Sequence, residues 1–190
     1  KTVRDAVWGD IRLTRLQAEV MDTRSFQRLR GIRQLGMSHL VYPSAMHSRF
    51  EHSLGTYWVT RKIIAHLAES SPERLPPLLS GELPGMVALL HDITHVPFGH
   101  TLEDERRLFQ RHDVCERRLK HMIEDSAIGA ILERAGLLVP VMAILSPSGK
   151  KLSEEWQLVK DVVSGPVGAD LLDYLRRDAL FCGLDLRYDD

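Results

Sequence analysis

Apolar residues recur at helical spacing along most of the chain, and this pattern predicts a mainly helical protein. The first clear helix has its N-cap at Asp22-Thr23 and runs to about Gly36, with Phe26, Leu29 and Ile32 on one side. The pattern then predicts helices over residues 51–70, up to about 91–92, and over 111–124, 126–135, 138–145, 153–163 and 167–180.

The N-terminal residues favour extended structure. Residues 3–14 form the best strand candidate, and Trp8-Gly9-Asp10 could turn them into a short hairpin. Prolines at 72, 76 and 77 predict a loop after the helix over 51–70. We therefore expect an all-α fold with a possible short N-terminal β-hairpin.

Composition narrows the class of protein. A chain of 190 residues with 44% apolar and 27% charged residues predicts one globular domain over residues 1–190. The net charge of -1 gives no basic field for nucleic acid, and no apolar run approaches the roughly 20 residues that span a bilayer. The cysteines Cys115 and Cys182 form no CxxC pair, which favours a reducing, cytoplasmic setting. We also expect the natural protein to continue beyond Asp190.

A candidate metal site is the sharpest chemical signal. The apolar run over residues 86–90 leads directly into His91-Asp92, and burying an imidazole beside a carboxylate is costly unless both are satisfied. His52 lies upstream and Asp170 downstream. Two imidazoles and two carboxylates suit one divalent ion of Mn, Fe, Zn or Ni, and are compatible with Mg. Because no sulfur takes part, a closed structural zinc site is disfavoured.

Each of these residues alone also has an ordinary structural explanation. His91-Asp92 could be a helix C-terminus where the dipole favours histidine. His52 could be a hydrogen-bonded core histidine, and Asp170 could be a carboxylate on a helix surface. It is their surroundings in the sequence that favour the joint interpretation.

Five ordered segments of the chain resemble one protein family. They are MDT with FQRLR (21–30), QLG (34–36), RFEHSLG (49–55), HDITHVPFGH (91–100) and ADLLDYLRRD (169–178). These segments resemble the HD-domain metal-dependent phosphohydrolases, in the branch of the dGTP triphosphohydrolases and the SAM-and-HD-domain dNTP triphosphohydrolases. The resemblance runs from about residue 1 to residue 183.

The resemblance implies a helical HD fold that hydrolyses a deoxynucleoside triphosphate to a deoxynucleoside and inorganic triphosphate. It implies that a single divalent metal ion is held by His52, His91, Asp92 and Asp170. Arg49 would contact a phosphate, a role that its planar fork of donors suits. His95 and His112 would lie along the phosphate chain.

The resemblance also assigns the leaving group and the sugar. His112 would be the better general acid, with Glu103 orienting it. The sugar would contact a set of four residues, Gln34, Leu35, Tyr174 and Asp178. Tyr174 and Asp178 would read the 3′-hydroxyl, and their spacing of four puts them on one helix face.

These assigned residues have structural alternatives as well. Arg49 could be a salt-bridged surface arginine, and Tyr174 could be core packing. Asp178 could lie on a solvated face, Glu103 could be a charge at a helix N-terminus, and His112 could be exposed.

Two departures from the family leave the substrate open. Relatives often carry a basic residue directly after the last metal-binding aspartate, where this chain has Leu171, and further triphosphate contacts normally lie beyond its end. A nucleotidase, phosphodiesterase or metal-dependent nuclease is the alternative, and a non-catalytic nucleotide-binding module is the third hypothesis.

The expected partners are a nucleotide substrate and further copies of the chain in a homo-oligomer. The resemblance to the allosteric member of the branch also implies an effector nucleotide site at Lys1, Asp5, Asp22, Gln27 and Arg30, which could instead cap helices and hold a dimer together. Nucleic acid is a less favoured partner, and no membrane is expected.

Overall fold

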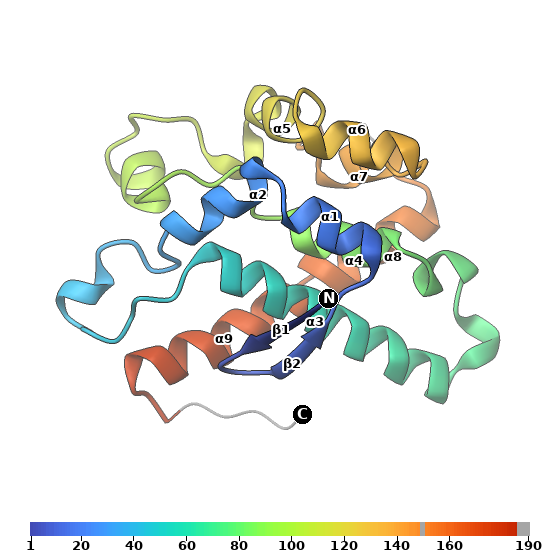
Figure 1. Cartoon of the computed structure of the whole chain (residues 1–190), viewed down its shortest axis with the longest axis horizontal. Coiled ribbons are helices and arrows are strands. Elements are labelled where there is room, and N and C mark those ends of the chain that lie inside the picture. Colours follow the sequence, from blue (N-terminus) through green and yellow to red (C-terminus); the bar gives the residue numbers. More distant parts are fainter. Residues whose placement is uncertain (149–150, 186–190) are drawn as a thin grey trace.

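The computed structural model describes residues 1–148 and 151–185, and Figure 1 shows them as helices joined to one small hairpin. The strands are β1 (Thr2–Asp5) and β2 (Gly9–Arg12). The helices are α1 (Arg15–Met21), α2 (Arg24–Gln27), α3 (Arg49–Ser70), α4 (Leu83–Leu90), α5 (Glu116–Met122), α6 (Ala127–Arg134), α7 (Leu138–Leu145), α8 (Glu154–Ser164) and α9 (Ala169–Cys182). The predicted all-α class with an N-terminal hairpin is confirmed. The expected extension beyond Asp190 and residues 186–190 themselves lie outside the described part.

The hairpin turns earlier than the sequence suggested. β1 and β2 pair antiparallel, with Thr2 opposite Arg12 and Asp5 opposite Gly9, so the turn lies at residues 6–8 and not at 8–10. The Asp5 carboxylate fixes it by accepting hydrogen bonds from the backbone N–H groups of Val7 and Trp8, each at 2.9 Å. This is the usual way in which an aspartate closes a turn onto its own backbone.

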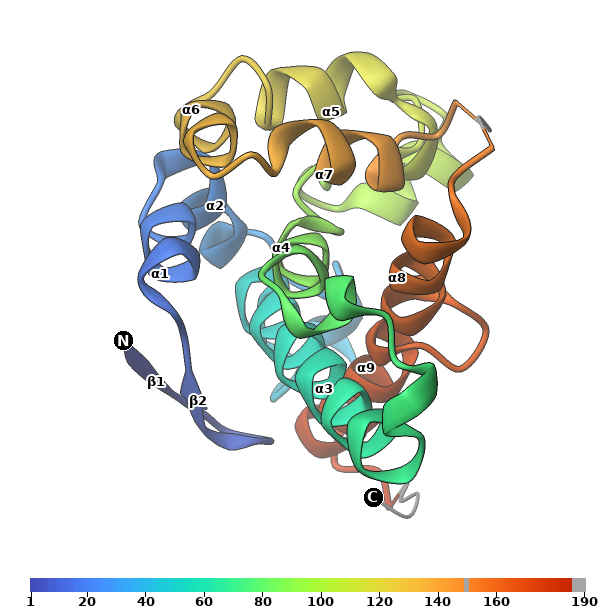
Figure 2. The same cartoon turned by 90° about the vertical axis from the view of Figure 1, so that its right-hand side faces the viewer.

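The short helix α4 forms the centre of the molecule. All of its residues are buried, as expected for a helix that is apolar on every side. It packs against α1, α3, α7 and α8, which surround it in Figure 2. Because α4 ends at Leu90, the next residues, His91 and Asp92, emerge inside the molecule as predicted.

Helix α3 begins two residues earlier than predicted, at Arg49. At its start the Glu51 carboxylate accepts hydrogen bonds from the backbone N–H and the hydroxyl of Ser48, at 2.6 and 2.8 Å. The buried residues lie in the first half of the helix, from Arg49 to Thr60. Ile63, Ile64 and Leu67 in the second half are only half buried.

The remaining differences lie near the N-terminus and around residue 111. Helix α1 was not predicted, although Thr14 and Gln17 form a capping box at its start. The helix expected from Thr23 to Gly36 is confined to α2 and a 3-10 turn over Arg28–Gly31, yet Thr23 does cap it. Helix α5 covers only part of the predicted range 111–124. Helices α6 to α9 agree with their predicted ranges to within two residues.

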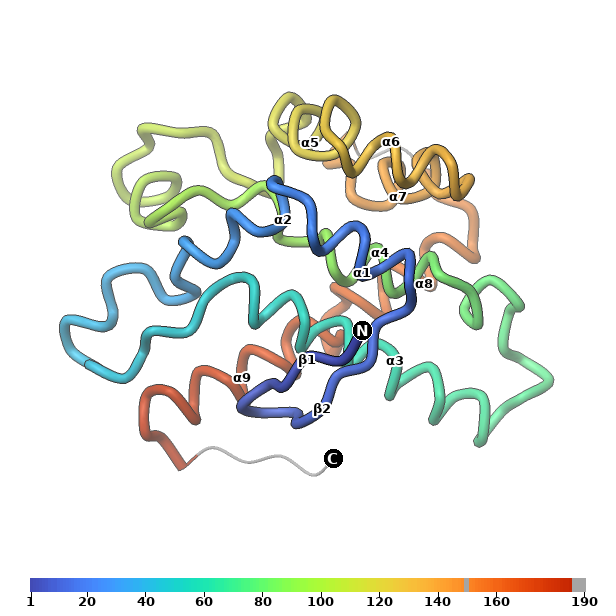
Figure 3. Tube along the Cα trace, viewed as in Figure 1, coloured from blue at the N-terminus to red at the C-terminus, as the bar shows by residue number. Residues whose placement is uncertain are grey.

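Two long connections reach the same side of the molecule. In the tube of Figure 3, the segments before α3 and after α4 both extend to the left. Residues of both segments, Gln34 and His95 among them, line one cavity. The second segment contains a π-helical turn over Thr101–Glu105 and a left-handed residue at Phe98. None of the described helices has the length and apolar character needed to cross a bilayer.

Candidate metal centre and catalytic site

Four ligand-type side chains from three helices meet at one point. His52 lies in the first turn of α3, His91 and Asp92 directly follow α4, and Asp170 lies in the first turn of α9. His52 Nε2 is 3.0 Å from Asp170 Oδ1 and 3.2 Å from His91 Nε2. Asp92 is 3.6 Å from the Nε2 atom of each histidine. The fold therefore brings His52, His91 and Asp170 into one group with ligand-like spacing, and Asp92 lies beside both histidines.

The two imidazoles are held so that their Nε2 atoms face this point. His52 Nδ1 is 2.8 Å from Asp173 Oδ2, and His91 Nδ1 is 2.7 Å from the carbonyl oxygen of Ala88. Histidines that bind metals use the second ring nitrogen in this way, because the bond fixes both tautomer and orientation.

The charges at this point fit a divalent cation. Burial favours a neutral His52, but Asp170, Asp173 and Asp92 outweigh it and raise the His52 pKa to about 9. The pKa of His91 is raised by Asp92 and Asp170, again against burial. Without an ion, the His52 imidazole holds a proton between carboxylates. A metal ion could take the place of that proton, and the donor set of two nitrogens and carboxylate oxygens suits one.

Arg49 is buried against the metal-type ligands. Its Nη1 atom donates to Asp92 Oδ2 at 2.6 Å, so the surface alternative for this arginine is wrong. Burial alone would raise the pKa of Asp92, but Arg49, His91 and His95 hold the pKa of that carboxyl well below its usual range. Asp92 is thus ionised and can bind a cation.

Two stacked histidines lie beside Asp92. His95 Nε2 is 3.2 Å from Asp92 Oδ1, and the His95 and His112 rings stack at 3.6 Å between centroids. Burial lowers the pKa of His95 to about 4, which makes the ring neutral at neutral pH. Asp92, His95 and His112 form a second group of atoms with ligand-like spacing.

The Glu103 carboxylate bridges His112 and Arg118. Its Oε2 atom is 2.8 Å from His112 Nδ1, and its Oε1 atom accepts from Arg118 at 2.7 Å. Burial would raise the pKa of Glu103, but these hydrogen bonds lower it and keep the carboxylate charged. His112 is partly buried, so the alternative of a fully exposed ring does not hold.

One cavity of about 180 Å³ contains several predicted substrate residues. Gln34, Leu35, Arg49 and His95 all line it, together with the exposed ring of Phe98. Within the described residues, Gln34 Oε1, Arg49 Nε and His95 Nδ1 are buried atoms without a hydrogen-bond partner. An unpaired buried polar atom is costly, so these three favour a polar ligand in the cavity.

A larger cavity of about 440 Å³ adjoins the metal-type residues on another side. His91, Asp92, His112 and Asp170 line it, and so does Lys160 of α8. Lys160 has no hydrogen-bond or ion-pair partner among the described residues. This cavity therefore combines metal-type ligands with a free cation.

The predicted sugar residues Tyr174 and Asp178 follow Asp170 on α9. Tyr174 is half buried. Asp178 Oδ1 is 2.7 Å from Nε2 of the buried His47, whose ring stacks on Phe181. The fold therefore gives Asp178 a partner within the chain, unlike the solvated face that was its alternative.

Residues that the sequence did not single out support the site. Asp173 and Arg177 are fully buried behind His52, and Arg118 holds Glu103. The ring of His100 lies 5.5 Å from that of His95 and 5.3 Å from that of His112. Asp173 and Arg177 lie three and seven residues after Asp170 on one helix. This spacing places them near the same helix face and could have indicated their role.

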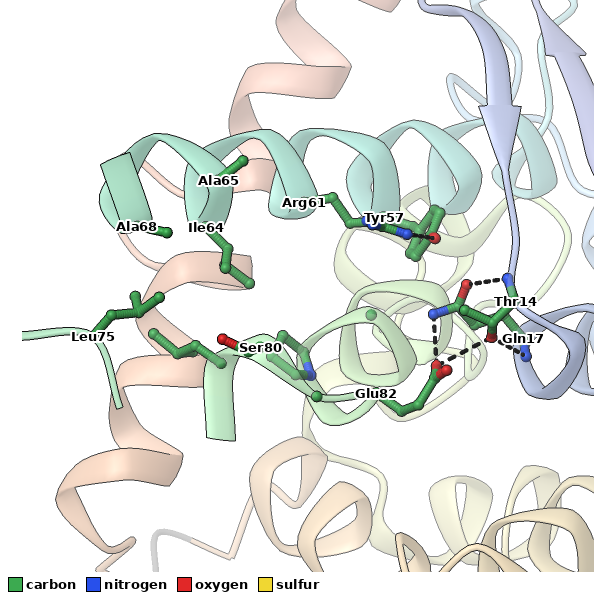
Figure 4. Close-up of a pocket in the computed structure, with 14 residues that line it drawn as sticks. Thr14, Gln17, Tyr57, Arg61, Ile64, Ala65, Ala68, Leu75, Ser80 and Glu82 are labelled. Carbon is green, nitrogen blue, oxygen red and sulfur yellow. Dashed lines mark hydrogen bonds between the residues drawn. The ribbon is translucent and has the colours of Figure 1, made fainter. Parts of the chain in front are cut away.

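A further cavity, of about 370 Å³, shares no lining residue with this site. Figure 4 shows it between the second half of α3 and the segment before α4, with Arg61 lying beside Tyr57. At one end the Glu82 carboxylate accepts hydrogen bonds from Thr14 and Gln17. Thr14, Gln17 and Glu82 are paired with one another, and the cavity adds nothing to the chemistry of the metal centre.

Comparison with known proteins agrees with this geometry. A family model described as HD domain matches residues 49–145, from the start of α3 to the end of α7. The chain belongs to the HD-domain family. The match includes three of the four metal-type residues of the HD centre, and Asp170 of α9 completes the set from outside it.

Several relatives match over nearly the whole HD chain. It is 39% identical to an uncharacterized protein of Methanocaldococcus jannaschii, over 96% of this chain and 34% of that protein. It is 29% identical to the human deoxynucleoside triphosphate triphosphohydrolase SAMHD1, over 100% of this chain and 34% of that protein. A crystal structure of a hypothetical protein from Aquifex aeolicus superposes with a TM-score of 0.80 at 35% identity, covering 100% of this chain and 48% of the other. The chain thus spans between a third and a half of these proteins.

Proposed function

We propose that this HD domain is a metal-dependent phosphohydrolase that converts deoxynucleoside triphosphates to deoxynucleosides and inorganic triphosphate. The observation that carries the proposal is the convergence of His52, His91, Asp92 and Asp170 beside the stacked pair His95 and His112. When bound there, a divalent cation would acidify water and polarise a phosphoryl oxygen.

In the proposed reaction, water attacks the α-phosphorus and the bond from that phosphorus to the 5′-oxygen breaks. The attacking water loses one proton, and the departing 5′-oxygen gains one, so that deoxynucleoside and triphosphate leave. His112 would supply the second proton, since Glu103 fixes its Nδ1 atom and leaves Nε2 free to face substrate. The neutral His95 would accept a hydrogen bond at its unpartnered Nδ1 atom.

Positive charge for the phosphates would come from two directions. Arg49 lines the smaller cavity with its Nε–H unpaired, and Lys160 lines the larger one. Lys160 would supply the cation that relatives carry at the position of Leu171. The names of relatives support the same substrate class, because the chicken protein, 31% identical over 88% of this chain, is also a deoxynucleoside triphosphate triphosphohydrolase.

The second candidate is hydrolysis of a phosphoester with less negative charge, by a nucleotidase, phosphodiesterase or nuclease. Leu171 favours this candidate because an apolar residue next to Asp170 cannot bind a phosphate. A nucleotide-binding module without catalysis is disfavoured by the intact set of ligand-type residues.

Assembly into a homo-oligomer and a cytoplasmic location stay predictions from the sequence. For the effector nucleotide, the candidate residues have partners within the chain. Lys1 Nζ pairs with Asp22 at 2.5 Å, and Arg30 Nε donates to Gln27 at 2.7 Å. Asp5 is buried. These contacts favour a structural role within the chain over an effector site.

Product analysis tests the proposal. The Mn²⁺-loaded protein is incubated with dNTPs, NTPs and short single-stranded DNA, and the products are identified by mass spectrometry. We expect deoxynucleoside and inorganic triphosphate from dNTPs. Both should be absent with EDTA and in the double variant His91→Ala/Asp92→Ala, which should keep its helical circular dichroism. Orthophosphate, cut DNA, or turnover in the double variant would contradict the proposal.

A further inference from the structure

The N-terminal hairpin contacts the back of the metal centre. Figure 1 shows β1 and β2 lying across α3 and α9. The indole Nε1–H of Trp8 donates to Asp173 Oδ1, and the same aspartate is bonded to His52 through its other oxygen. Residues at the two ends of the chain therefore share one carboxylate with a ligand-type histidine.

A buried arginine completes this connection. Arg177 Nε and Nη2 donate to the two oxygens of Asp173 at 2.9 and 3.0 Å. On its other side, Arg177 donates to both oxygens of Asp5, at 2.9 and 3.2 Å. Asp173 and Arg177 are fully buried, and Asp5 is 6% exposed. Ion pairs this deep are costly to assemble, and they rarely favour stability over a well-packed apolar core.

The charges show what this cluster does for His52. One arginine lies between two aspartates, so a single negative charge is left over, and His52 Nδ1–H is the donor that faces it. If Asp5 were neutral, Arg177 would bind the charge of Asp173 alone, and Asp173 would be a weaker acceptor for His52. A weaker acceptor lowers the basicity of His52 Nε2 and loosens the orientation of the ring.

The backbone makes room for the cluster. Gly55 lies one turn after His52 on α3, and a Cβ there would be 1.8 Å from Asp173 Oδ1 and 2.4 Å from Arg177 Nη2. A glycine within a helix is costly relative to alanine. The fold accepts this cost at the point where the ion pair lies between α3 and α9.

We propose that the N-terminal hairpin is a working part of the metal centre, in which Asp5 and Trp8 are positioning residues that act on His52 through Arg177 and Asp173. This inference rests on the proposed metal site, although it does not depend on the substrate. Asp5 would share Arg177 with Asp173 and so keep Asp173 a strong acceptor for His52, and the Trp8 indole would hold its carboxylate in the plane that His52 requires.

Metal affinity provides the first test. Mn²⁺ is titrated by calorimetry into the metal-free wild type and into Asp5→Asn, Trp8→Phe and Asp10→Asn. Changes behind a ligating histidine typically weaken metal binding roughly 10- to 100-fold, and we expect this for Asp5→Asn, with a smaller loss for Trp8→Phe. Asp10→Asn is the matched control, since Asp10 lies in the same hairpin in an exposed pair with Arg4.

A spectroscopic test follows the wild-type protein itself. The Trp8 indole N–H signal of ¹⁵N-labelled wild-type protein is followed as Zn²⁺, a diamagnetic ion, is added. It is assigned by elimination with Trp58→Phe and Trp156→Phe. We expect the Trp8 signal to shift as metal is added, with the same dissociation constant as metal binding itself. Wild type that binds no metal would overturn the proposed function. Tight binding without a Trp8 shift, or with Asp5→Asn equal to wild type, would overturn only this inference.

Discussion

The Glu103 carboxylate lies 2.8 Å from Nδ1 of His112, and it keeps that distance because Arg118 holds its other oxygen. If His112 is the general acid, Glu103→Gln should lower kcat by about 100-fold, the usual size of such effects, while Mn²⁺ affinity stays unchanged. Steady-state kinetics and metal titration check both parts. Glu105→Gln, at an exposed position of the same segment, is the control. Equal kcat in the two variants would remove Glu103 from the mechanism.

Gly55→Ala should be strongly destabilising. The new methyl group would enter the space of the Asp173–Arg177 ion pair, and breaking a buried pair costs roughly 3–5 kcal/mol. The free energy of unfolding from urea titration measures this. Gly31→Ala is the control, because a Cβ at Gly31 meets no atom within 4 Å. Similar stability of the two variants would show that α3 and α9 are less closely packed than described.

The stabilisation that a metal ion confers should grow with pH. In the metal-free protein the His52 pKa is raised from 6.5 to about 9. This raised pKa contributes stability that is fully present below pH 6.5 and is lost as the pH rises towards about 9. A bound ion needs the deprotonated imidazole, so its affinity should rise over the same window. Melting temperatures with Mn²⁺ and with EDTA should therefore diverge from pH 6.5 to 9. A constant difference would mean that the ion does not compete with this proton.

Asp178→Ala should weaken recognition of the sugar while it leaves metal binding intact. Loss of a hydrogen bond to a charged group costs about 1.5–3 kcal/mol, which is roughly 10- to 100-fold in kcat/KM. The ratio of kcat/KM for a dNTP to kcat/KM for its 2′,3′-dideoxy analogue should fall by that factor. His47→Ala is the informative comparison, since it removes the partner of Asp178 and keeps the carboxylate. An unchanged preference in Asp178→Ala would place the residue outside the sugar site.

Much of the site could be predicted because its ligands sit at helix ends that the sequence marks. The apolar run of α4 ends where His91 and Asp92 begin, and Ser48 with Glu51 marks the start of the turn that carries His52. The resemblance, and not the periodicity, indicated which distant segments meet. The sequence pattern alone contained no distance between His52 and Asp170.

The buried support of the site was harder to predict. Asp173 and Arg177 read as surface charges on an amphipathic helix, because burial of an ion pair depends on Asp5 and Trp8 arriving from the other end of the chain. The left-handed Phe98 and the π-helical turn after it have no strong local signal either. Helix α1 is different, since the Thr14–Gln17 capping box was present in the sequence and was overlooked.

The most direct test of the central claim is a crystal structure of the protein grown with Mn²⁺, with an anomalous difference map. We predict one peak bonded to Nε2 of His52 and His91 and to carboxylate oxygens of Asp92 and Asp170. A peak held instead by Asp92, His95 and His112, or no peak within bonding distance of Asp170, would contradict the account.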